Sequence, residues 1–364
     1  MAKRIGVDKW LFGIVIVLVV VGLVMVFSAS AVMAETKYHS PYTFVLKQMA
    51  WAALGLAAMA GLMAVPYRWY NQPKVVYVTM AATTALLIGV YAMRDSHNTH
   101  RWFRFGGFFT FQPSEIAKPV LVLFLAWFLQ SRLQQMDDVR RTLLPAAFVA
   151  GFFTLLIFGE PDLGTAMVCA GTAALMLYLA GMRMRYLGYA ALAAAPVMYW
   201  ALFRVAWRRA RMLAFVNPEA DPKGTGFHTL QSLIAVGTGG IHGLGLMEGR
   251  QKLFYLPEAH TDFIFANVCE ELGLIGAVLV VGLFVALGYR GLRAAYLSRD
   301  PFARFLAFGI TSALLLQAFF NMSVVLAIVP TKGIPLPFIS SGGTSVFITL
   351  ASMGVLLNVT REIE

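Results

Sequence analysis

The sequence has little charge, almost no cysteine and no stretch of low complexity. Charged residues make up only 13% of the 364 residues, whereas 59% are hydrophobic. The mean hydropathy is +0.72. A soluble domain of this size needs much more polar surface, so the composition excludes a water-soluble globular protein. The chain is therefore predicted to be an integral membrane protein.

Cysteine occurs only twice, as Cys169 and Cys269, and each lies inside an apolar run. Two isolated thiols provide neither a disulfide framework nor a thiolate metal site. We expect both to be small buried hydrophobic residues.

Acidic residues are also few, which leaves a net charge of +11. In a soluble protein this excess would suggest nucleic acid as a partner, but the sequence contains no nucleic-acid-binding motif. Most basic residues fall in short loops beside apolar runs, where anionic lipid headgroups explain them. The predicted partner of this charge is the lipid bilayer, not nucleic acid.

The sequence contains many long apolar runs. Residues 11–34 carry no charge and exceed the roughly 20 residues that cross a bilayer as a helix, so this run is too long for a signal-peptide core. The pattern predicts an all-α, polytopic fold of about ten transmembrane helices in a single membrane domain over residues 1–364. The predicted spans are 11–33, 44–65, 75–93, 115–131, 143–158, 163–182, 186–203, 263–289, 305–328 and 342–360.

The distribution of lysine and arginine predicts the orientation. With the N-terminus in the cytoplasm, every inner segment carries Lys or Arg, from Lys9 to Arg361, as the positive-inside rule requires. All six histidines then lie outside, and a long extracytoplasmic loop, about residues 204–262, precedes the eighth helix. Its glycines are interspersed with apolar residues, so we expect it to fold back onto the membrane domain.

The densest cluster of reactive groups is Tyr255-Leu-Pro-Glu258-Ala-His260-Thr261-Asp262, directly before an apolar run. Thr261 is predicted to cap the following helix, with Asp262 in its first turn. An ionised carboxylate sheltered from water is what a general base requires. The alternative is a purely capping Asp262, but the nearby Glu258 and His260 favour function.

Glu270 and Glu271 follow inside the same predicted helix. Carboxylates within a membrane are costly and are usually functional or paired. Adjacent helical residues point in different directions, so at most one is expected to face the outer cavity, and an ion pair is expected for the other.

A second cluster begins at Arg101-Trp102 and continues through Gln112-Pro-Ser114-Glu115-Ile-Ala-Lys118. Ser114 is predicted to cap a helix on which Glu115 and Lys118 share a face, either as an intrahelical ion pair or as catalytic groups. Arg101 has the forked donors that bind phosphate oxygens, although an Arg-Trp pair is also an ordinary interfacial anchor.

Two further motifs lie at outer connections. In Glu160-Pro-Asp162-Leu-Gly-Thr165, turn formation and helix capping by Asp162 are the expected roles. The segment from Pro330 to Ser345 has three prolines and three glycines, so it is predicted to be re-entrant or to line a cavity. Lys332 in such a place indicates an anionic ligand.

Together these motifs resemble the SEDS family (shape, elongation, division and sporulation proteins), which polymerise lipid II into peptidoglycan. The resemblance covers nearly the whole chain and is closer to the division branch than to the elongation branch. Asp262 aligns with the essential aspartate of the family. The residues that match or flank its other motifs, and are therefore predicted to bind substrate or support the site, are Arg101, Glu115, Lys118, Glu258, His260, Lys332, Ser340 and Ser341.

The resemblance implies an inverting β-1,4 glycan polymerase. Asp262 would deprotonate the 4-hydroxyl of an acceptor lipid II, which attacks the anomeric carbon of the growing strand and expels undecaprenyl diphosphate. Positive charge would stabilise this leaving group; the candidates, in falling order, are Arg101, Lys118, Lys332 and Arg211. No cofactor is implied, although a divalent cation, Mg or Mn, could share this role.

The family also implies a class B penicillin-binding transpeptidase and other divisome proteins as partners. The expected location is the bacterial cytoplasmic membrane at the division septum, with both termini cytoplasmic. Two other functions fit a polytopic protein with intramembrane charges, namely a lipid II flippase and a non-catalytic divisome scaffold.

Overall fold

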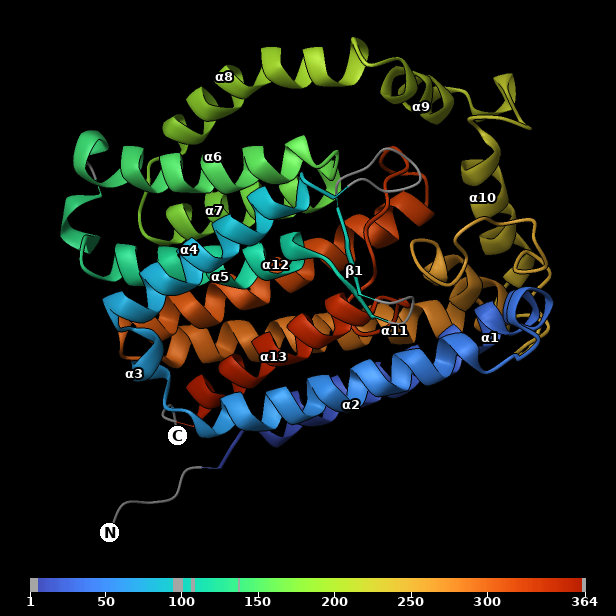
Figure 1. Cartoon of the computed structure of the whole chain (residues 1–364), viewed down its shortest axis with the longest axis horizontal. Coiled ribbons are helices and arrows are strands. Elements are labelled where there is room, and N and C mark those ends of the chain that lie inside the picture. Colours follow the sequence, from blue (N-terminus) through green and yellow to red (C-terminus); the bar gives the residue numbers. More distant parts are fainter. Residues whose placement is uncertain (1–5, 94–100, 106–108, 137, 362–364) are drawn as a thin grey trace.

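The structure is a computed structural model that describes residues 6–93, 101–105, 109–136 and 138–361, and most of these residues are helical. Long helices run side by side across the molecule (Figure 1). In chain order the helices are α1 (Lys9–Tyr38), α2 (Thr43–Ala64), α3 (Tyr67–Tyr70), α4 (Pro73–Val90), α5 (Pro113–Gln130), η1 (Leu133–Gln135), η2 (Val139–Leu143), α6 (Leu144–Gly159), α7 (Leu163–Leu179), α8 (Met184–Phe203), α9 (Ala206–Val216), η3 (Pro218–Ala220), α10 (Phe227–Gly239), α11 (Ile264–Leu297), α12 (Pro301–Val325) and α13 (Gly343–Thr360).

The prediction of an all-α membrane protein is confirmed. Within the described ranges, seven helices are long and apolar enough to cross a membrane, namely α1, α2, α4, η2 with α6, α11, α12 and α13. Each of the ten predicted spans overlaps one long helix, but α5, α7 and α8 are shorter or less apolar than those seven. The total of ten membrane crossings therefore stays a prediction.

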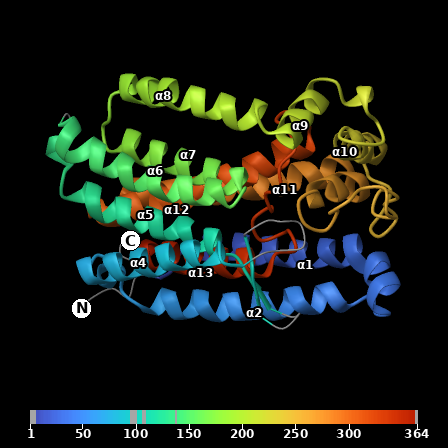
Figure 2. The ribbon, with the colours of Figure 1, turned by 45° about the horizontal axis from the view of Figure 1, so that its top comes forward.

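The centre of the bundle is formed by α12 and α13, the most buried of the candidate spans. α12 packs against α5, α7, α11 and α13, and α13 packs along α2. By contrast, α8 has no buried residue among those described, and Figures 1 and 2 both show it at the periphery. The helices that lead into the site are thus held by the core, whereas α8 is exposed outside it.

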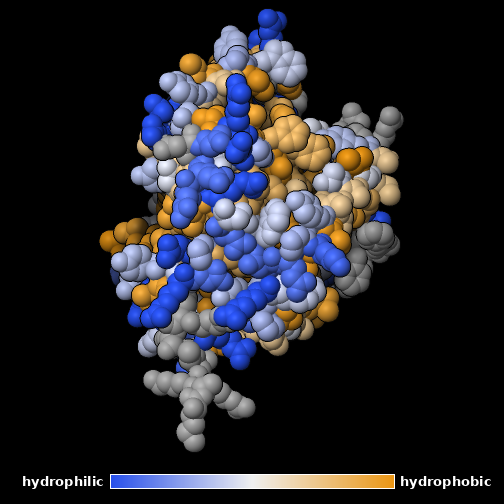
Figure 3. Space-filling model, turned by 90° about the vertical axis from the view of Figure 1, so that its left-hand side faces the viewer, coloured by the Kyte–Doolittle hydropathy of each residue, from blue (hydrophilic) through white to orange (hydrophobic). Residues whose placement is uncertain are grey.

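The start of α1 and the end of α13 lie at the same end of the bundle. The carboxylate of Asp8 caps α1 and pairs with Arg290 of α11 at 2.6 Å, and the Asp8 backbone N–H donates to Thr360 Oγ1. Figure 3 looks onto this end, where hydrophilic residues gather. The exposed basic residues at this end include Arg140, Arg141, Arg183, Arg185, Arg293 and Arg299. These residues lie in the segments predicted to face the cytoplasm, and the orientation of those segments stays a prediction.

Two short strands, β1 (Phe103–Phe105) and β2 (Phe109–Phe111), form an antiparallel pair before α5. Their sequence alternates phenylalanine with polar residues, as expected of a half-buried hairpin. The Thr344 hydroxyl of α13 donates to the Thr110 carbonyl, which ties the pair to the start of α13. The all-α prediction included no strands here. Residues 94–100, including His97 and His100, lie outside the described residues.

The long segment between α8 and α11 is folded and packs back on the bundle, as predicted. It contains α9, η3 and α10, and α10 packs on α11 and α12. The segment after α10 enters a break in α11 at Gly273, whose φ is +64°. There the N–H groups of Leu244 and Gly245 donate to the carbonyls of Glu270 and Glu271, because these carbonyls lose their helical partners at the break.

Candidate functional site

The site lies at the end of the bundle opposite the chain termini, where two irregular segments meet. One is the turn before α11, and the other is the extended segment 330–342 before α13. The Ser340 hydroxyl donates to the Thr261 carbonyl at 2.6 Å, and the Ser341 N–H donates to the His260 carbonyl at 2.9 Å. Asn321 of α12 joins both segments, since its amide donates to the carbonyls of Asp262 and Ile334.

The predicted helix cap at Thr261 is wrong. α11 begins at Ile264 with Phe263 as its N-cap residue and without a side-chain cap. The Thr261 hydroxyl instead donates to the Glu258 carboxylate at 2.9 Å, inside a turn in which Glu258 has a φ of +55°. Asp262 thus belongs to a turn before the helix, because the chain reverses direction at Glu258.

The Asp262 carboxylate faces the 330–342 segment. A Cβ placed on Gly333 would lie 2.6 Å from Oδ2 of Asp262, so only glycine fits here without displacing the carboxylate. Burial raises the pKa of Asp262 to about 7, the negative charges of Glu258 and Asp162 add to this rise, and Arg101 and Arg211 oppose it. A carboxylate with such a pKa can accept a proton near neutral pH.

Next to Asp262 is a cavity that is open to the surface. Its lining includes four basic side chains and one carboxylate, namely Arg101, Arg208, Arg211, Lys332 and Asp162. Gly333, the neighbour of Asp262, also lines it. The excess of positive charge fits an anionic ligand bearing more than one negative charge.

Arg101 and Lys332 reach this cavity from different elements. The Arg101 guanidinium donates to the carbonyls of Glu160 and Pro161, which orients it at the start of α7. Lys332 Nζ lies 2.8 Å from Met167 Sδ, and burial together with the charge of Arg208 lowers the pKa of Lys332 to about 8. Three of the four predicted leaving-group cations, Arg101, Lys332 and Arg211, therefore come together.

Arg208 was not among the residues predicted from the sequence. It stands three residues before Arg211, so both lie on one face of α9 and line the cavity together. The basic run Arg208-Arg209-Ala-Arg211 was the signal that could have found it.

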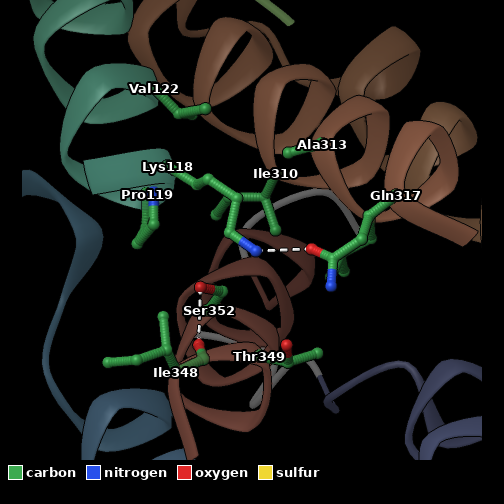
Figure 4. Close-up of a pocket in the computed structure, with 10 residues that line it drawn as sticks. Lys118, Pro119, Val122, Ile310, Ala313, Gln317, Ile348, Thr349 and Ser352 are labelled. Carbon is green, nitrogen blue, oxygen red and sulfur yellow. Dashed lines mark hydrogen bonds between the residues drawn. The ribbon is translucent and has the colours of Figure 1, made fainter. Parts of the chain in front are cut away.

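Lys118, the fourth predicted cation, does not line this cavity. Its ammonium group pairs with Glu115 at 2.9 Å, the intrahelical ion pair that the spacing predicts, and donates to Gln317 Oε1 at 2.5 Å. Figure 4 shows this lysine beside a second, smaller cavity between α5, α12 and α13. Gln317 in turn donates to the Pro335 carbonyl. Lys118 and Glu115 therefore support the 330–342 segment through Gln317.

Asp162 caps α7, as predicted. It accepts hydrogen bonds from the Thr165 N–H and hydroxyl and from the Gln112 amide. The predicted cap at Ser114 is wrong, because Gln112 is the N-cap residue of α5 and Pro113 takes the first helical position. The Ser114 hydroxyl points to Asp162 Oδ2 at 3.4 Å and thus belongs to the same polar cluster.

Glu160 is fully buried, and no described residue forms a hydrogen bond with either carboxyl oxygen. Burial and the neighbouring Asp162 raise the pKa of Glu160 to about 9, against the opposing charge of Arg101. At neutral pH this side chain is therefore an uncharged acid beside the cationic cavity.

Glu258 and His260 flank Asp262 in different ways. The negative charge of Glu258 acts on Asp262, and its carboxylate accepts the Thr261 hydrogen bond. The His260 ring is buried against Phe44 of α2 with centroids 4.8 Å apart, and burial lowers the pKa of this histidine. His260 is thus a neutral packing group whose backbone anchors Ser341.

Glu270 and Glu271 both hold the folded-back segment, and neither lines the cationic cavity. Glu271 pairs with Lys252 at 2.7 Å and accepts from the Ser28 hydroxyl and the Met247 N–H. Glu270 accepts from the N–H groups of Arg250 and Gln251. The expected ion pair is confirmed for Glu271.

The structure gives no specific support to a metal ion. In the part of the chain that it describes, no three His, Cys, Asp or Glu side chains group as metal ligands. Asp162 already directs its oxygens to Thr165 and Gln112.

Comparison with known proteins gives a consistent result. The family model for FtsW, RodA and SpoVE, described as "Cell cycle protein", matches residues 8–364. A "Probable peptidoglycan glycosyltransferase FtsW" of Geobacter metallireducens is 42% identical over 94% of this chain and 92% of that protein. Stage V sporulation protein E of Bacillus subtilis is 39% identical over 99% of this chain and 98% of that protein.

Solved structures share the fold. A chain described under "Structural coordination of polymerization and crosslinking by a peptidoglycan synthase complex" superposes with a TM-score of 0.79 at 27% identity, covering 98% of both chains. Thermus thermophilus RodA, a rod shape determining protein, superposes with a TM-score of 0.72 at 26% identity, covering 98% of this chain and 97% of that one.

Proposed function

This chain belongs to the FtsW/RodA/SpoVE family of cell cycle proteins, and on that basis we propose that it is a peptidoglycan glycosyltransferase that polymerises lipid II during cell division. The observation that carries the proposal is the juxtaposition of Asp262 with a cavity lined by four basic side chains. A general base beside an anion site is the arrangement that glycosyl transfer from a lipid diphosphate requires. Relatives named peptidoglycan glycosyltransferase support the same activity.

In the proposed reaction Asp262 is the general base. Its carboxylate takes the proton from the 4-hydroxyl of the acceptor sugar, and the oxygen forms a bond to the anomeric carbon of the donor strand from the face opposite the leaving group. The bond between that carbon and the diphosphate oxygen breaks, and its electron pair leaves with undecaprenyl diphosphate. The pKa of Asp262, about 7, suits this role near neutral pH.

The cationic cavity is the proposed site of the diphosphate. Charge develops on the leaving oxygen as the glycosidic bond breaks, and fixed positive groups stabilise it. Arg101 is held by backbone carbonyls and Lys332 contacts Met167 Sδ, so both charges are in place before the reaction. Arg208 and Arg211 complete the cavity from α9.

The remaining predicted site residues support these two groups. Ser340 and Ser341 bind the turn that carries Asp262, and Glu115 with Lys118 holds Gln317 beneath Pro335. Glu258 adjusts the pKa of Asp262. We assign them positioning roles, because none of them lines the cationic cavity.

The proposed location is the bacterial cytoplasmic membrane, with both termini in the cytoplasm and the site outside. The start of α1 and the end of α13 lie together at the end of the bundle that carries the exposed arginines, which supports this orientation. A class B penicillin-binding transpeptidase is the proposed partner, since one structural neighbour is part of a complex that couples polymerisation and crosslinking.

One assay on purified protein separates this function from its two rivals. Lipid II in detergent should be converted to glycan polymer by the wild-type chain. In proteoliposomes a flippase would move lipid II across the membrane without forming polymer, and a scaffold would do neither. Absence of polymer under conditions in which the protein stays folded would refute the proposed activity.

A further inference from the structure

The two faces of α9 differ in character. Arg208, Arg211 and Met212 line the cationic cavity. On a helical projection, Leu213 and Val216 fall with Arg209 on a face adjacent to the one that lines the cavity, and they are 61% and 78% exposed. Two large apolar side chains exposed on one side of a short helix that also carries arginines make α9 amphipathic.

The position of α9 in the chain indicates what that environment is. α9 begins three residues after α8, whose last turns expose the aromatic rings of Tyr199 and Trp200 by 64% and 60%. Exposed tyrosine and tryptophan near the end of an apolar helix mark the boundary between membrane and water. α9 therefore starts at the depth of the lipid headgroups.

The direction and charge of α9 fit that depth. Figures 1 and 2 show α9 running across the direction of the long bundle helices, as a helix lying in the membrane surface would. Arg209 on α9 and Arg204 at the end of α8 are exposed and can reach lipid phosphates while Leu213 lies in the acyl region. Leu202, in the last turn of α8, also lines the cavity, so cavity and interface are continuous.

We propose that α9 is an interfacial helix whose Leu213 and Val216 face enters the outer leaflet while its Arg208 and Arg211 face forms a wall of the cationic cavity. A lipid-linked diphosphate then reaches the cavity within the headgroup layer, without leaving the bilayer. This inference rests on the proposed function for the identity of the ligand, but the placement of α9 in the membrane does not.

The depth of α9 can be measured without any activity. An environment-sensitive fluorophore on Leu213→Cys, in the full chain in vesicles of phosphatidylglycerol and phosphatidylethanolamine, should lose emission to nitroxide-labelled lipids and resist aqueous iodide. The native Cys169 and Cys269 are buried, and the unsubstituted chain provides the labelling background. The matched control is Glu219→Cys in η3, an exposed position beyond α9, which should show the reverse pattern. Iodide quenching at position 213 would overturn the proposal. It is the result expected if a protein partner normally covers this face, because the vesicles lack that partner and the face would then be open to water.

The effect on the site is tested with charge on the lipid face. Leu213→Glu with Val216→Glu should raise the KM for lipid II about tenfold in proteoliposomes, equivalent to about 1.4 kcal/mol of binding, and change it little in detergent. The apolar pair Leu213→Phe with Val216→Phe should keep the wild-type KM in both. Arg208→Gln should raise KM in both, because it removes a proposed ligand contact. An equal KM effect of the glutamate pair in detergent and in vesicles would contradict the role of the membrane. Absence of polymer from the wild type would refute the proposed function and leave the depth measurement valid.

Discussion

Gly333 and Asp262 lie so close together that a methyl group on Gly333 would stand 2.6 Å from Oδ2 of the carboxylate. Asn321 fixes this approach, because its amide donates to the Asp262 carbonyl at 2.8 Å and to the Ile334 carbonyl at 2.7 Å. The position of the proposed base is thus determined by a backbone about seventy residues away in sequence. The backbone of the 330–342 segment therefore positions Asp262, independently of which of its side chains face the cavity.

Gly333→Ala is therefore expected to displace the Asp262 carboxylate while the fold survives. A displacement on the order of 1 Å can lower the rate of a positioned reaction by about 10²-fold. The measurement is kcat for polymerisation per folded molecule. The control is Gly342→Ala in the same segment, where the nearest atom to a new Cβ is 3.5 Å away, and it should stay near wild type. An equal loss of kcat in both variants would mean that alanine disturbs the segment in general, and would contradict a specific effect on Asp262.

The pH dependence of polymerisation should be bell-shaped. Asp262, with a pKa of about 7, must be ionised to accept a proton, and Lys332, with a pKa of about 8, must be charged to bind the diphosphate. Activity should thus rise as the pH increases towards 7 and fall above 8. Lys332→Arg keeps its charge in this range, so the alkaline limb should move to higher pH. An acidic limb near pH 4, typical of an exposed aspartate, would argue against a buried base.

Glu160→Gln should stabilise the protein at neutral and alkaline pH. The pKa of Glu160 is about 9 in the folded chain, above its ordinary value of 4.5, so the folded state retains a proton that the unfolded state releases. Stability is lost as the pH rises from about 4.5 to 9, and the loss at pH 7 is roughly 3 kcal/mol. The melting temperature of the variant should exceed that of the wild type at pH 8, with the gap closing near pH 5. A gap of the same size at both pH values would show that the carboxyl is not titrating as described.

Lys252→Met should destabilise the fold, because it leaves the Glu271 carboxylate buried without its 2.7 Å partner. Breaking a buried ion pair on one side typically costs about 3–5 kcal/mol. The double variant Lys252→Met with Glu271→Gln should recover part of this loss. Arg141→Met serves as the control, since it breaks the pair with Asp138, whose side chains are 81% and 42% exposed, and should cost less than about 1 kcal/mol. Thermal unfolding in detergent measures all four proteins.

The apolar runs and the charge asymmetry were enough to predict the membrane class and the approximate helix positions, because both reflect average hydropathy over many residues. The break in α11 was not predicted. It depends on Gly273 accepting a positive φ and on the N–H groups of Leu244 and Gly245 arriving from another segment. Such a long-range replacement of helical hydrogen bonds leaves no periodic pattern in the sequence.

The site was predicted in its chemistry more than in its geometry. Asp262 was predicted from the cluster of ionisable groups before α11 and from the family resemblance, and Arg101 from the phosphate-binding geometry of its guanidinium. Lys332 was predicted because a cation in an apolar segment needs an anionic ligand, and Arg211 because the implied reaction has an anionic leaving group. The roles of Thr261 and Ser114 as caps were wrong, since an unusual turn at Glu258 and a proline after Gln112 moved both helix starts. Lys118 was assigned to the ligand because its partner Gln317, 199 residues away, cannot be seen from local spacing.

The central claim is that Asp262 acts as a base, and the most direct test is the polymer formed per folded molecule by Asp262→Asn from lipid II in detergent. Asparagine keeps the size of the side chain, and the Asn321 hydrogen bond uses the backbone carbonyl, so folding should be nearly normal. Since general base catalysis contributes about 10²- to 10⁴-fold, the account predicts a loss of at least that order with an unchanged melting temperature. Polymer formation near the wild-type rate by the folded variant would contradict it.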